Sequence, residues 1–470
     1  MARKVAIVGG GISGLVTGFY VKKFARERSL EVSVTLYEKD ELPGGKMRTY
    51  REEGFIVEWG PNGFLTNKPD TLILCEDLSI TGRLLPSSDA ARKRFVFTGG
   101  KLKRLPESAL AFFQSSILSK RGRIRVAMEP FIPGRKGDGD ESLTNFARRR
   151  LGEEATEKLI EPMAAGIYAG DPDKMSLKSC FPLIHELELR YGSLVRGMFA
   201  RMRERKGSSG GEKGGPAGPG GVLTSFDGGV TTIVEALEGR GDFDVRLGWK
   251  IVSLTKPGEG GYSLMCNHKG SRISDNADVV VLASPAYAAS EIVGDLDPGI
   301  SETLGAIPYA PVSVVSIGFE KKGLEEKLNA FGFLVPRGEE RKVLGVLYDS
   351  CIFSNRAPEG YVLLRGMVGG ARNPTYATLD EDELIEMVRK EMEGIIGIDI
   401  DPVFIKLFVH ERGIPQYLVG HGDRVNGLEE SLLKYPGLYL NNNAYRGIGL
   451  NDCVKHSREG ALRIIEYLDS

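Results

Sequence analysis

The stretch VAIVGGGISGLVTGFY, Val5 to Tyr20, decides the fold of this chain. Its first part, Val5–Val8, is an apolar run of strand length, and a cluster of glycines follows it. The spacing of apolar residues from Ser13 to about Glu27 predicts a helix, and Val32–Tyr37 predicts a second strand. Together these segments form a βαβ unit, which predicts an α/β, Rossmann-like domain built on a parallel sheet.

The glycines of this stretch predict a dinucleotide-binding turn. Gly9, Gly11 and Gly14 form the pattern G-x-G-x-x-G between the strand and the helix. Gly9 permits a tight turn, Gly11 lets the backbone approach a pyrophosphate, and Gly14 lets the helix pack closely on the strand. The free N–H groups at the helix N-terminus attract phosphate. Glu38 ends the second strand and is expected to accept hydrogen bonds from the ribose hydroxyls of an adenosine.

Composition limits the function classes that the chain can belong to. Its 470 residues allow two or three domains, and its 41% apolar and 27% charged residues are ordinary for a globular protein. The formal net charge of -1 argues against nucleic acid as a partner. The five cysteines and five histidines lack the spacing of a metal site, so no metal is expected. With neither a signal-peptide pattern nor a membrane-spanning apolar run, the expected location is cytoplasmic.

Three further glycine-rich blocks favour FAD over NAD. The segment LPGGKMRTY brings a second glycine doublet, Gly44-Gly45, followed by Arg48. The turn Glu58-Trp59-Gly60-Pro61 offers backbone that can follow an extended flavin, and NAYRGIGLND offers amides for the far end of the same cofactor. The chain is therefore expected to bind FAD.

The middle of the chain changes in character. From about Ser108 to Arg203 the pattern is helical and rich in Arg and Lys, which predicts a helical subdomain. Residues 205–221 carry Gly, Ser and Pro without a core-forming residue, so a disordered surface loop is expected, with a functional lid as the alternative. Runs such as PVSVVSIGF and GYVLLRGMVGG then predict a β-rich region.

At this point the chain resembles the amine-oxidase-like FAD superfamily and, more closely, the protoporphyrinogen oxidases. The resemblance extends over nearly the whole length, and it depends on the shared order of blocks rather than on any one of them. These blocks include VAIVGGGISGL, LPGGKMRT, EWGPNGF, KRFVFTGGKLKRLP, EPMAAGIYAGDPDKMSLKSCFP, FDGGVTTIVEAL, FGFLVPRGEERKVLGVLYDS, RGMVGG, GIPQYLVGH and NAYRGIGLNDC.

The resemblance implies a flavoenzyme of haem biosynthesis that oxidises a porphyrinogen. Removing six electrons and six protons from protoporphyrinogen IX yields protoporphyrin IX, so one FAD acts three times, with O2 as acceptor and H2O2 as product. Hydride transfer to a flavin requires no dedicated protein base, so no catalytic side chain is expected. Cys453 lacks the context of a covalent flavin cysteine, so FAD is expected to bind noncovalently. The expected cofactor contacts are Gly9, Gly11, Ile12, Ser13, Gly14, Glu38, Lys39, Gly45, Lys46, Arg48, Glu58, Trp59, Gly60, Pro61, Val252, Asn443, Gly447, Ile448 and Gly449.

The resemblance also implies the substrate contacts. Arg94 precedes Phe95-Val96-Phe97 and matches the family arginine that binds a substrate propionate, although a basic hairpin is usually a solvated face. Phe331 and Leu334 match residues that clamp the pyrrole rings, and Met367 matches a further apolar wall. Gly166 matches a glycine that leaves room beside the macrocycle. For Phe331, Leu334, Met367 and Gly166 the alternative is ordinary core packing. Phe333 is expected on the other sheet face, and His421 is expected to be structural or near the flavin.

The expected architecture is a discontinuous Rossmann-like FAD domain with a mixed β-sheet substrate domain and a helical, membrane-associated subdomain. The boundaries are 1–85, 222–300 and 405–470 for the FAD domain, 86–107 and 301–404 for the substrate domain, and 108–204 for the helical subdomain. The segment Ala109–Pro133 mixes apolar and basic residues, so it is expected either to pack on its neighbours or to rest on the cytoplasmic face of a membrane. A homodimer and hand-over of product to a chelatase are further expected associations.

Three other functions stay open. Coproporphyrinogen III is the close alternative substrate, because related bacterial enzymes of similar sequence use it. Amine oxidation or carotenoid desaturation would make the block around Arg94 a coincidence. A non-enzymatic module with the FAD fold would be expected to have degraded phosphate-loop glycines, and here they are intact.

Overall fold

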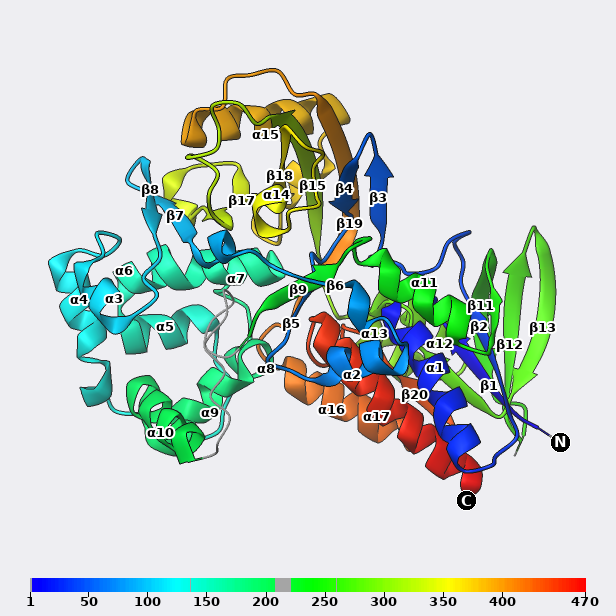
Figure 1. Ribbon diagram of the computed structural model, residues 1–470. Coiled ribbons are helices and arrows are strands. Elements are labelled where there is room, and N and C mark those ends of the chain that lie inside the picture. Colours follow the sequence, from blue (N-terminus) through cyan, green and yellow to red (C-terminus); the bar gives the residue numbers. More distant parts are fainter. Residues whose placement is uncertain (1, 136, 208–220, 259) are drawn as a thin grey trace.

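The computed structural model describes residues 2–135, 137–207, 221–258 and 260–470 (Figure 1). The predicted loop at 205–221 lies almost wholly outside these residues. Within them, Figure 1 shows three parts: a lower region with both termini, an upper region around a large sheet, and a helical region at the left. No helix in the described part of the chain is long and apolar enough to cross a membrane.

The region with both termini is built on a parallel sheet, which confirms the predicted βαβ unit. Strand β1 (Arg3–Val8) pairs in parallel with β2 (Val32–Tyr37) on one side and with β14 (Val279–Leu282) on the other. The strands of this sheet, in spatial order, are β10 (Asp244–Arg246), β2 (Val32–Tyr37), β1 (Arg3–Val8), β14 (Val279–Leu282) and β20 (Leu438–Leu440). Two apolar cores flank the sheet, because alternate residues of each strand point to opposite faces.

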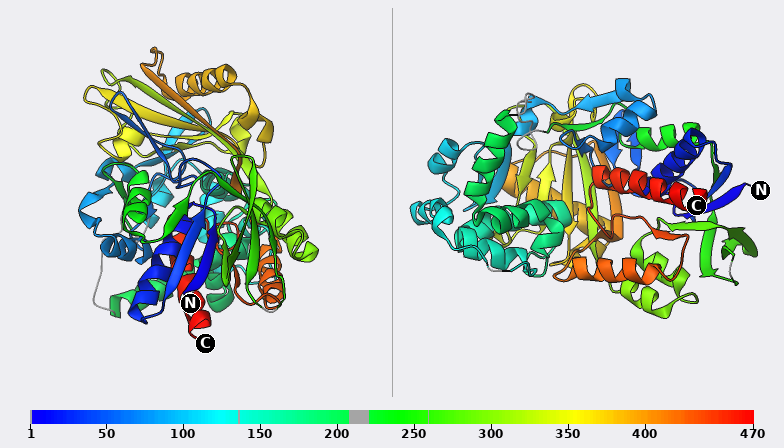
Figure 2. Two further views of the ribbon diagram at one scale, coloured as in Figure 1. Left: turned by 90° about the vertical axis from the view of Figure 1, so that its right-hand side faces the viewer. Right: turned by 90° about the horizontal axis from the view of Figure 1, so that it is seen from below.

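Helices cover one face of the parallel sheet, and a smaller sheet with further helices covers the other (Figure 2). The first face carries α1 (Ile12–Glu27), α2 (Asp70–Asp77), α11 (Thr231–Arg240) and α17 (Leu450–Asp469). The second carries β11 (Trp249–Thr255), β12 (Tyr262–His268) and β13 (Ser271–Ala277) with α12 (Ala286–Val293), α13 (Pro298–Gly305) and α16 (His421–Leu432). Segments from the two ends and the middle of the chain therefore build one domain.

The upper region is a seven-stranded sheet that is antiparallel except at one pair. Its strands, in spatial order, are β19 (Phe404–Pro415), β15 (Tyr309–Glu320), β18 (Tyr361–Gly369), β17 (Val343–Leu347), β16 (Gly332–Leu334), β7 (Arg94–Thr98) and β8 (Lys101–Arg104). Helix α15 (Glu381–Ile396) packs on one face, while α14 (Asp349–Ile352), η5 (Arg337–Glu339) and η6 (Pro374–Thr378) connect its strands. The predicted boundary between 404 and 405 is wrong at this point, because β19 pairs with β15 along its length.

Short elements connect the two regions. The hairpin of β3 (Thr49–Glu52) and β4 (Phe55–Glu58) packs on the large sheet, where Phe55 stacks on Phe404. A small sheet joins the chain before and after the helical segment. It comprises β5 (Phe64–Leu65), β9 (Leu223–Phe226) and β6 (Leu84–Pro86), with η1 (Thr81–Arg83) and η2 (Asp89–Arg92) beside it.

The segment predicted to be helical is helical. Its elements are α3 (Ala109–Gln114), α4 (Lys120–Ala127), η3 (Glu129–Phe131), α5 (Leu143–Leu151), α6 (Glu153–Ala155), η4 (Thr156–Ile160), α7 (Glu161–Tyr168), α8 (Leu177–Cys180), α9 (Pro182–Tyr191) and α10 (Leu194–Gly207). The stretch Ala109–Pro133 thus forms three short helical pieces rather than one helix. A buried ion pair between Arg150 and Glu129 ties the third piece to α5.

Candidate functional site

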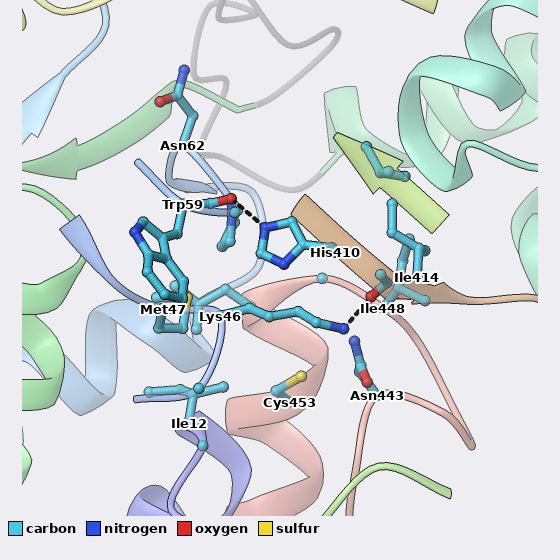
Figure 3. A pocket seen from close by; sticks show the side chains of 18 of the residues that line it. Ile12, Lys46, Met47, Trp59, Asn62, His410, Ile414, Asn443, Ile448 and Cys453 are labelled. Atoms are coloured by element: carbon cyan, nitrogen blue, oxygen red, sulfur yellow. Dashed lines mark hydrogen bonds between the residues drawn. The ribbon is translucent and has the colours of Figure 1, made fainter. Parts of the chain in front are cut away.

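One cavity of about 1870 Å³ runs between the parallel sheet, the large sheet and the helical subdomain. At one end it is lined by the glycine turn after β1, and at the other by β7, β16, β18 and helix α7. Figure 3 shows its middle, where side chains from α1, from the loop before β3, from β19 and from the start of α17 converge. The cavity is therefore large enough to hold a dinucleotide at one end and a second molecule at the other.

The glycine turn has the geometry of a phosphate cradle. Gly9 has a φ of +112°, and a Cβ there would lie 2.7 Å from the backbone N of Ser284. A Cβ on Gly14 would lie 2.0 Å from the Gly9 oxygen, so this residue must be glycine for α1 to approach β1. A Cβ on Gly11 would meet nothing within 4 Å, because Gly11 faces the cavity. Helix α1 begins there without a side-chain cap, which leaves its first N–H groups to an anionic ligand.

Glu38 stands at the end of β2 in the position predicted for a ribose partner. Its carboxylate accepts hydrogen bonds from the N–H of Gly10 at 2.7 Å and of Asp40 at 2.9 Å. These two bonds fix the carboxylate at the cavity wall, and its remaining lone pairs can accept hydroxyl groups. The donors and acceptors of this end fit an adenosine diphosphate group.

The second glycine doublet joins the cradle. The N–H of Gly44 donates to the Gly10 oxygen at 2.7 Å, and Gly44 and Gly45 have φ values of +98° and +58°. The guanidinium of Arg48 lies 5.2 Å from the centre of the Trp59 ring and is fixed by the Leu42 oxygen. The predicted segment therefore follows the cavity wall.

Lys46 brings a buried amine to the middle of the cavity (Figure 3). Its Nζ donates to the Arg412 oxygen at 3.0 Å and to the Gly413 oxygen. Burial lowers the pKa of Lys46 to about 8. The amine is therefore still mostly charged at pH 7, and it binds backbone oxygens in the last part of β19.

Most of the predicted cofactor residues line the cavity, but Gly14, Glu58 and Gly447 lie behind its wall. Glu58 is fully buried and forms an ion pair with Arg356 at 3.0 Å. Burial is the largest influence on the Glu58 carboxyl and raises its pKa, while Arg356 opposes that change. A Cβ on Gly447 would lie 2.5 Å from Asp452, so this glycine serves the tight turn before α17. Direct cofactor contact at these three positions stays a prediction, while the structure shows each of them supporting the wall from behind.

The substrate residues predicted by resemblance converge at the other end of the cavity. Strand β16 pairs in parallel with β7, so that Gly332 lies opposite Arg94. The Arg94 guanidinium lies 4.8 Å from the centre of the Phe331 ring, and its buried Nε has no hydrogen-bond partner in the described structure. Burial lowers the pKa of Arg94, an effect that Glu107 opposes. A desolvated cation is thus available to a carboxylate.

The rest of this end is an apolar slot. A Cβ on Gly166 would lie 2.8 Å from the Leu334 side chain, so the missing side chain of Gly166 makes room at that wall. Met367 on β18 lines the cavity from the same sheet face as Leu334, because Gly345 lies opposite both residues. Further apolar lining comes from Leu105, Pro106, Leu159, Ile160, Met163 and Ile167. Phe333 is buried in the core beside Tyr348, as strand alternation predicts. The slot suits a flat apolar ligand that carries negative charge at one edge.

His421 and Cys453 have structural surroundings. The His421 ring stacks on Tyr417 at 4.1 Å and its Nε2 contacts the Tyr445 oxygen at 3.0 Å. Burial lowers the pKa of His421 to about 4, so the imidazole is neutral at pH 7. Cys453 lines the cavity (Figure 3), and burial raises the pKa of its thiol to about 12. His421 is therefore structural, as expected, and the Cys453 thiol is poorly disposed to ionise.

Asn62 and His410 are among the cavity residues that the sequence-based prediction missed. Asn62 donates to Asp349 at 3.0 Å, and its buried Oδ1 has no partner within the described residues. Asn62 follows Pro61 directly in EWGPNGF, so that block contained the signal. His410 lines the cavity from β19, where no local motif marks it. Both side chains add polar atoms to an otherwise apolar region.

The fold and this cavity define a flavin-dependent oxidoreductase. The family model described as flavin containing amine oxidoreductase matches residues 12–465, and the chain belongs to this family. It is 34% identical over 481 aligned residues to the chloroplastic protoporphyrinogen oxidase 1 of Arabidopsis thaliana, covering 98% of this chain and 88% of that protein. It is 31% identical over 485 aligned residues to the coproporphyrinogen III oxidase of Bacillus subtilis, covering 100% and 99%.

A solved structure is similar along the whole chain. A crystal structure from an Exiguobacterium species, described provisionally as a protoporphyrinogen oxidase, superposes with a TM-score of 0.84 at 28% identity and covers 100% of both chains. The predicted resemblance and the predicted enzyme class are thus confirmed, and the α/β architecture with mixed sheets is confirmed as well.

Proposed function

We propose that this enzyme binds FAD noncovalently and oxidises protoporphyrinogen IX to protoporphyrin IX, with O2 as acceptor and H2O2 as product. The observation that carries the proposal is the half-buried Arg94 guanidinium at the edge of an apolar slot, whose buried Nε–H has no partner within the described residues. This slot is continuous with the glycine cradle that fits a dinucleotide. The names of two relatives, a protoporphyrinogen oxidase and a coproporphyrinogen III oxidase, support the substrate class.

The charges of the slot favour protoporphyrinogen over coproporphyrinogen. Arg92, Arg94, Glu107 and Arg365 are the charged residues that line it within the described part of the chain. Arg92 contacts Asp89 at 3.1 Å and Arg365 contacts Asp349 at 3.1 Å, so both cations already face a carboxylate. Arg94 forms no ion pair within the described residues. One such cation suits the adjacent propionates of protoporphyrinogen, whereas coproporphyrinogen would place further propionates against apolar walls.

The chain contributes binding, orientation and exclusion of water. When bound, the flavin supplies the acceptor for an electron pair, and three such transfers complete the six-electron oxidation. Arg94 anchors the propionate edge, while Leu334, Phe331 and Met367 hold the macrocycle between apolar walls. Fixing the ring in this way orients its reacting carbon toward the cofactor end of the cavity.

The first experiment measures flavin and substrate turnover directly. Purified protein is tested for flavin absorbance, and then supplied separately with protoporphyrinogen IX and coproporphyrinogen III in air while porphyrin fluorescence is recorded. We expect bound FAD, peroxide formation and a higher kcat/KM for protoporphyrinogen. A colourless protein, or a flavoprotein inert to both substrates, contradicts the proposal. A higher kcat/KM for coproporphyrinogen III contradicts the choice of protoporphyrinogen IX as the preferred substrate.

Arg94→Ala tests the propionate anchor. The loss of a charge-assisted contact is expected to raise KM for protoporphyrinogen by about tenfold or more, with bound flavin unchanged. Lys101→Ala is the matched control, because Lys101 is an exposed cation on the neighbouring strand that does not line the cavity. An unchanged KM in Arg94→Ala contradicts the assigned role. Turnover of amines or a carotenoid precursor, in place of porphyrinogens, would favour the other functions expected for this superfamily.

We also propose a cytoplasmic enzyme that rests on the cytoplasmic face of the membrane. The support is a set of exposed apolar side chains on the helical subdomain near basic helix α4: Phe113, Ile124, Met128 and Phe131. Amphipathic surfaces of this kind bind anionic bilayers. Co-flotation with vesicles that contain anionic lipid, lost in Phe131→Asp, tests this proposal, and flotation equal for both proteins contradicts it. A homodimer and hand-over of product to a chelatase stay predictions.

A further inference from the structure

His410 lies in the middle of the cavity, on the sheet face that also carries Met367 of the substrate slot. It lies opposite Val312 on β15, while Met367 on β18 lies opposite Val314 of the same strand. Val312 and Val314 are two residues apart, so they and their partners share one face of the sheet. All of these residues line the cavity. His410 and Met367 are separated by two strand spacings across the sheet and by two residues along it. Together these give about 12 Å, a span comparable with the width of a tetrapyrrole.

The hydrogen bonding of His410 defines its tautomer. Its Nε2 lies 2.9 Å from the backbone oxygen of Trp59 (Figure 3). A carbonyl oxygen only accepts hydrogen bonds, so Nε2 carries the proton. In the neutral ring, Nδ1 then keeps its lone pair, and no hydrogen bond within the described residues engages it. The structure therefore presents an unprotonated imidazole nitrogen at the cavity.

The surroundings of His410 keep the ring neutral at pH 7. Burial is the largest influence and lowers its pKa below 6.5, and the charge of Lys46 lowers it further. The hydrogen bond to Trp59 opposes these effects. Lys46 is held by the oxygens of Arg412 and Gly413, just beyond His410 on the same strand. A neutral base with a lowered pKa readily releases a proton that it has accepted, and this property suits repeated turnover.

The proposed reaction requires such an acceptor. Over the three two-electron steps the macrocycle loses four C–H bonds at its carbon bridges and two pyrrole N–H bonds. Each step removes one bridge hydrogen together with its electron pair and releases one further proton, which comes from a pyrrole N–H in two of the steps and from a carbon bridge in the third. A new double bond forms in the macrocycle. The slot walls are largely apolar, so a proton released there has few acceptors. Of the histidines, His410 alone lines the cavity among the described residues.

We propose that His410 Nδ1 is the general base that accepts the proton released in each two-electron step, which is a pyrrole N–H proton in two of the three steps and a carbon-bridge proton in the third. The inference rests on the proposed function and revises the expectation that no side chain is catalytic. The electron pair and its hydrogen pass to the flavin, and the imidazolium releases its proton before the next step. Each O2 becomes H2O2 by taking up the electron pair with its hydrogen and one further proton. The proton released by the imidazolium supplies this second hydrogen, so the cycle balances.

His410→Gln is the matched variant, because its side-chain amide retains an N–H donor for the Trp59 oxygen and lacks the Nδ1 base. We expect the rate constant for reduction of bound flavin by protoporphyrinogen to fall by about 100-fold or more. KM and the spectrum of bound flavin are expected to stay unchanged. In His410→Ala, added imidazole is expected to restore part of the rate. His185→Gln is the control, since His185 lies on α9 and does not line the cavity.

A second measurement tests the tautomer without turnover. The 15N chemical shifts of histidine-labelled protein, with His410 assigned by its loss in His410→Gln, distinguish a protonated from an unprotonated Nδ1. An unprotonated Nδ1 at pH 7 is expected, and a protonated Nδ1 overturns the inference. The role of His410 as a base is also overturned if His410→Gln reduces flavin at the wild-type rate, or if its rate falls only together with loss of flavin. Neither of these outcomes affects the proposed function. A wild-type enzyme inert to both porphyrinogens refutes both proposals.

Discussion

Two glycines of the same motif should respond to the same substitution in opposite ways. Gly11→Ala adds a methyl group that meets nothing within 4 Å and that points into the cavity. Gly11 has φ -70° and ψ 177°, which alanine adopts readily. We expect the free energy of unfolding of the apoprotein to change by less than about 1 kcal/mol. The flavin affinity should fall at least tenfold, which is about 1.4 kcal/mol, because the methyl group occupies the space of the phosphates.

Gly14→Ala should damage the fold itself. Its Cβ would lie 2.0 Å from the Gly9 oxygen, a backbone atom that cannot rotate away. Displacing α1 from β1 is expected to cost at least about 1–3 kcal/mol, and flavin binding should fail as a consequence. Chemical denaturation of the apoproteins measures the free energy of unfolding. Titration with FAD, followed by flavin fluorescence, measures the flavin affinity.

Gly239→Ala is the control for these variants, because this helical glycine on α11 also has open space around it and does not line the cavity. It should be neutral or slightly stabilising and should bind flavin normally. Binding of FAD by Gly11→Ala as tight as in the wild type refutes the assigned role of Gly11, and so does a loss of stability as large as that of Gly14→Ala.

Three further outcomes are expected. Arg356→Leu should lower the free energy of unfolding by about 3–5 kcal/mol, because it leaves Glu58 buried without its ion-pair partner; denaturant unfolding measures this loss. Folding lowers the pKa of His421 from 6.5 to about 4. The contribution of the neutral ring to the free energy of unfolding should therefore be fully present above pH 6.5 and should fall by up to about 3 kcal/mol toward pH 4. His421→Gln should flatten this pH dependence in unfolding curves recorded across the same range. Gly166→Ala should displace Leu334, raising KM for porphyrinogen with unchanged flavin affinity in steady-state assays.

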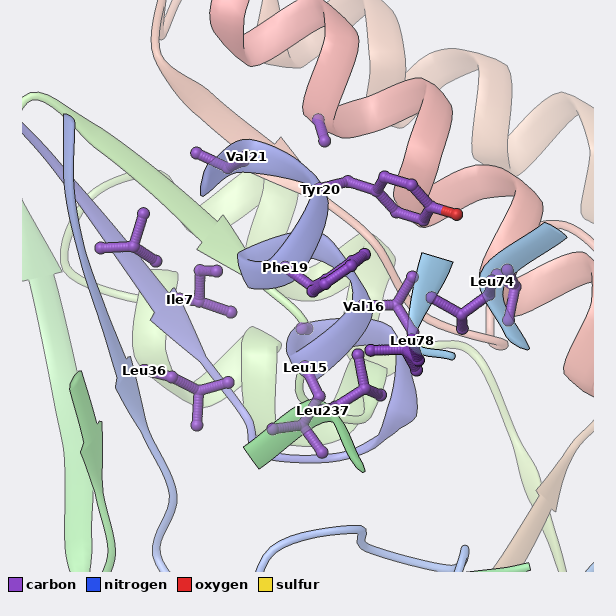
Figure 4. Packing of buried hydrophobic residues seen from close by; sticks show 14 of the residues in the cluster. Ile7, Leu15, Val16, Phe19, Tyr20, Val21, Leu36, Leu74, Leu78 and Leu237 are labelled. Carbon is purple, nitrogen blue, oxygen red and sulfur yellow. The ribbon is translucent and has the colours of Figure 1, made fainter. Parts of the chain in front are cut away.

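The cofactor half of the molecule was predictable because its information is local. The helix predicted from Ser13 begins at Ile12, and the strand predicted at Val32–Tyr37 has those bounds. Ile7, Leu15, Val16, Phe19 and Leu36, with their neighbours, pack around α1 at the spacing that amphipathic periodicity requires (Figure 4). A phosphate cradle needs several backbone groups within one turn, so a short motif is sufficient to predict it.

The substrate half was less predictable because its walls come together through long-range pairing. Arg94 meets Phe331 only because β7 pairs in parallel with β16, a partner more than 200 residues away. Composition alone favoured a solvated basic hairpin, and the assignment of Arg94 depended on resemblance. The error at the 404/405 boundary has a related cause: Phe404–Pro415 has the pattern of a strand, and local sequence does not say which sheet it joins.

Polar groups at the cavity are the hardest class to predict, since their role depends on a partner rather than on their residue type. A histidine within a strand is usually a packed or solvated side chain. His410 differs because the Trp59 oxygen accepts from one ring nitrogen and thereby leaves the other as a base. Trp59 itself belongs to a turn that the sequence associated with the cofactor. The same turn thus connects the two halves of the site: it lines the part of the cavity predicted for the flavin, and one of its carbonyl oxygens orients a side chain on the large sheet.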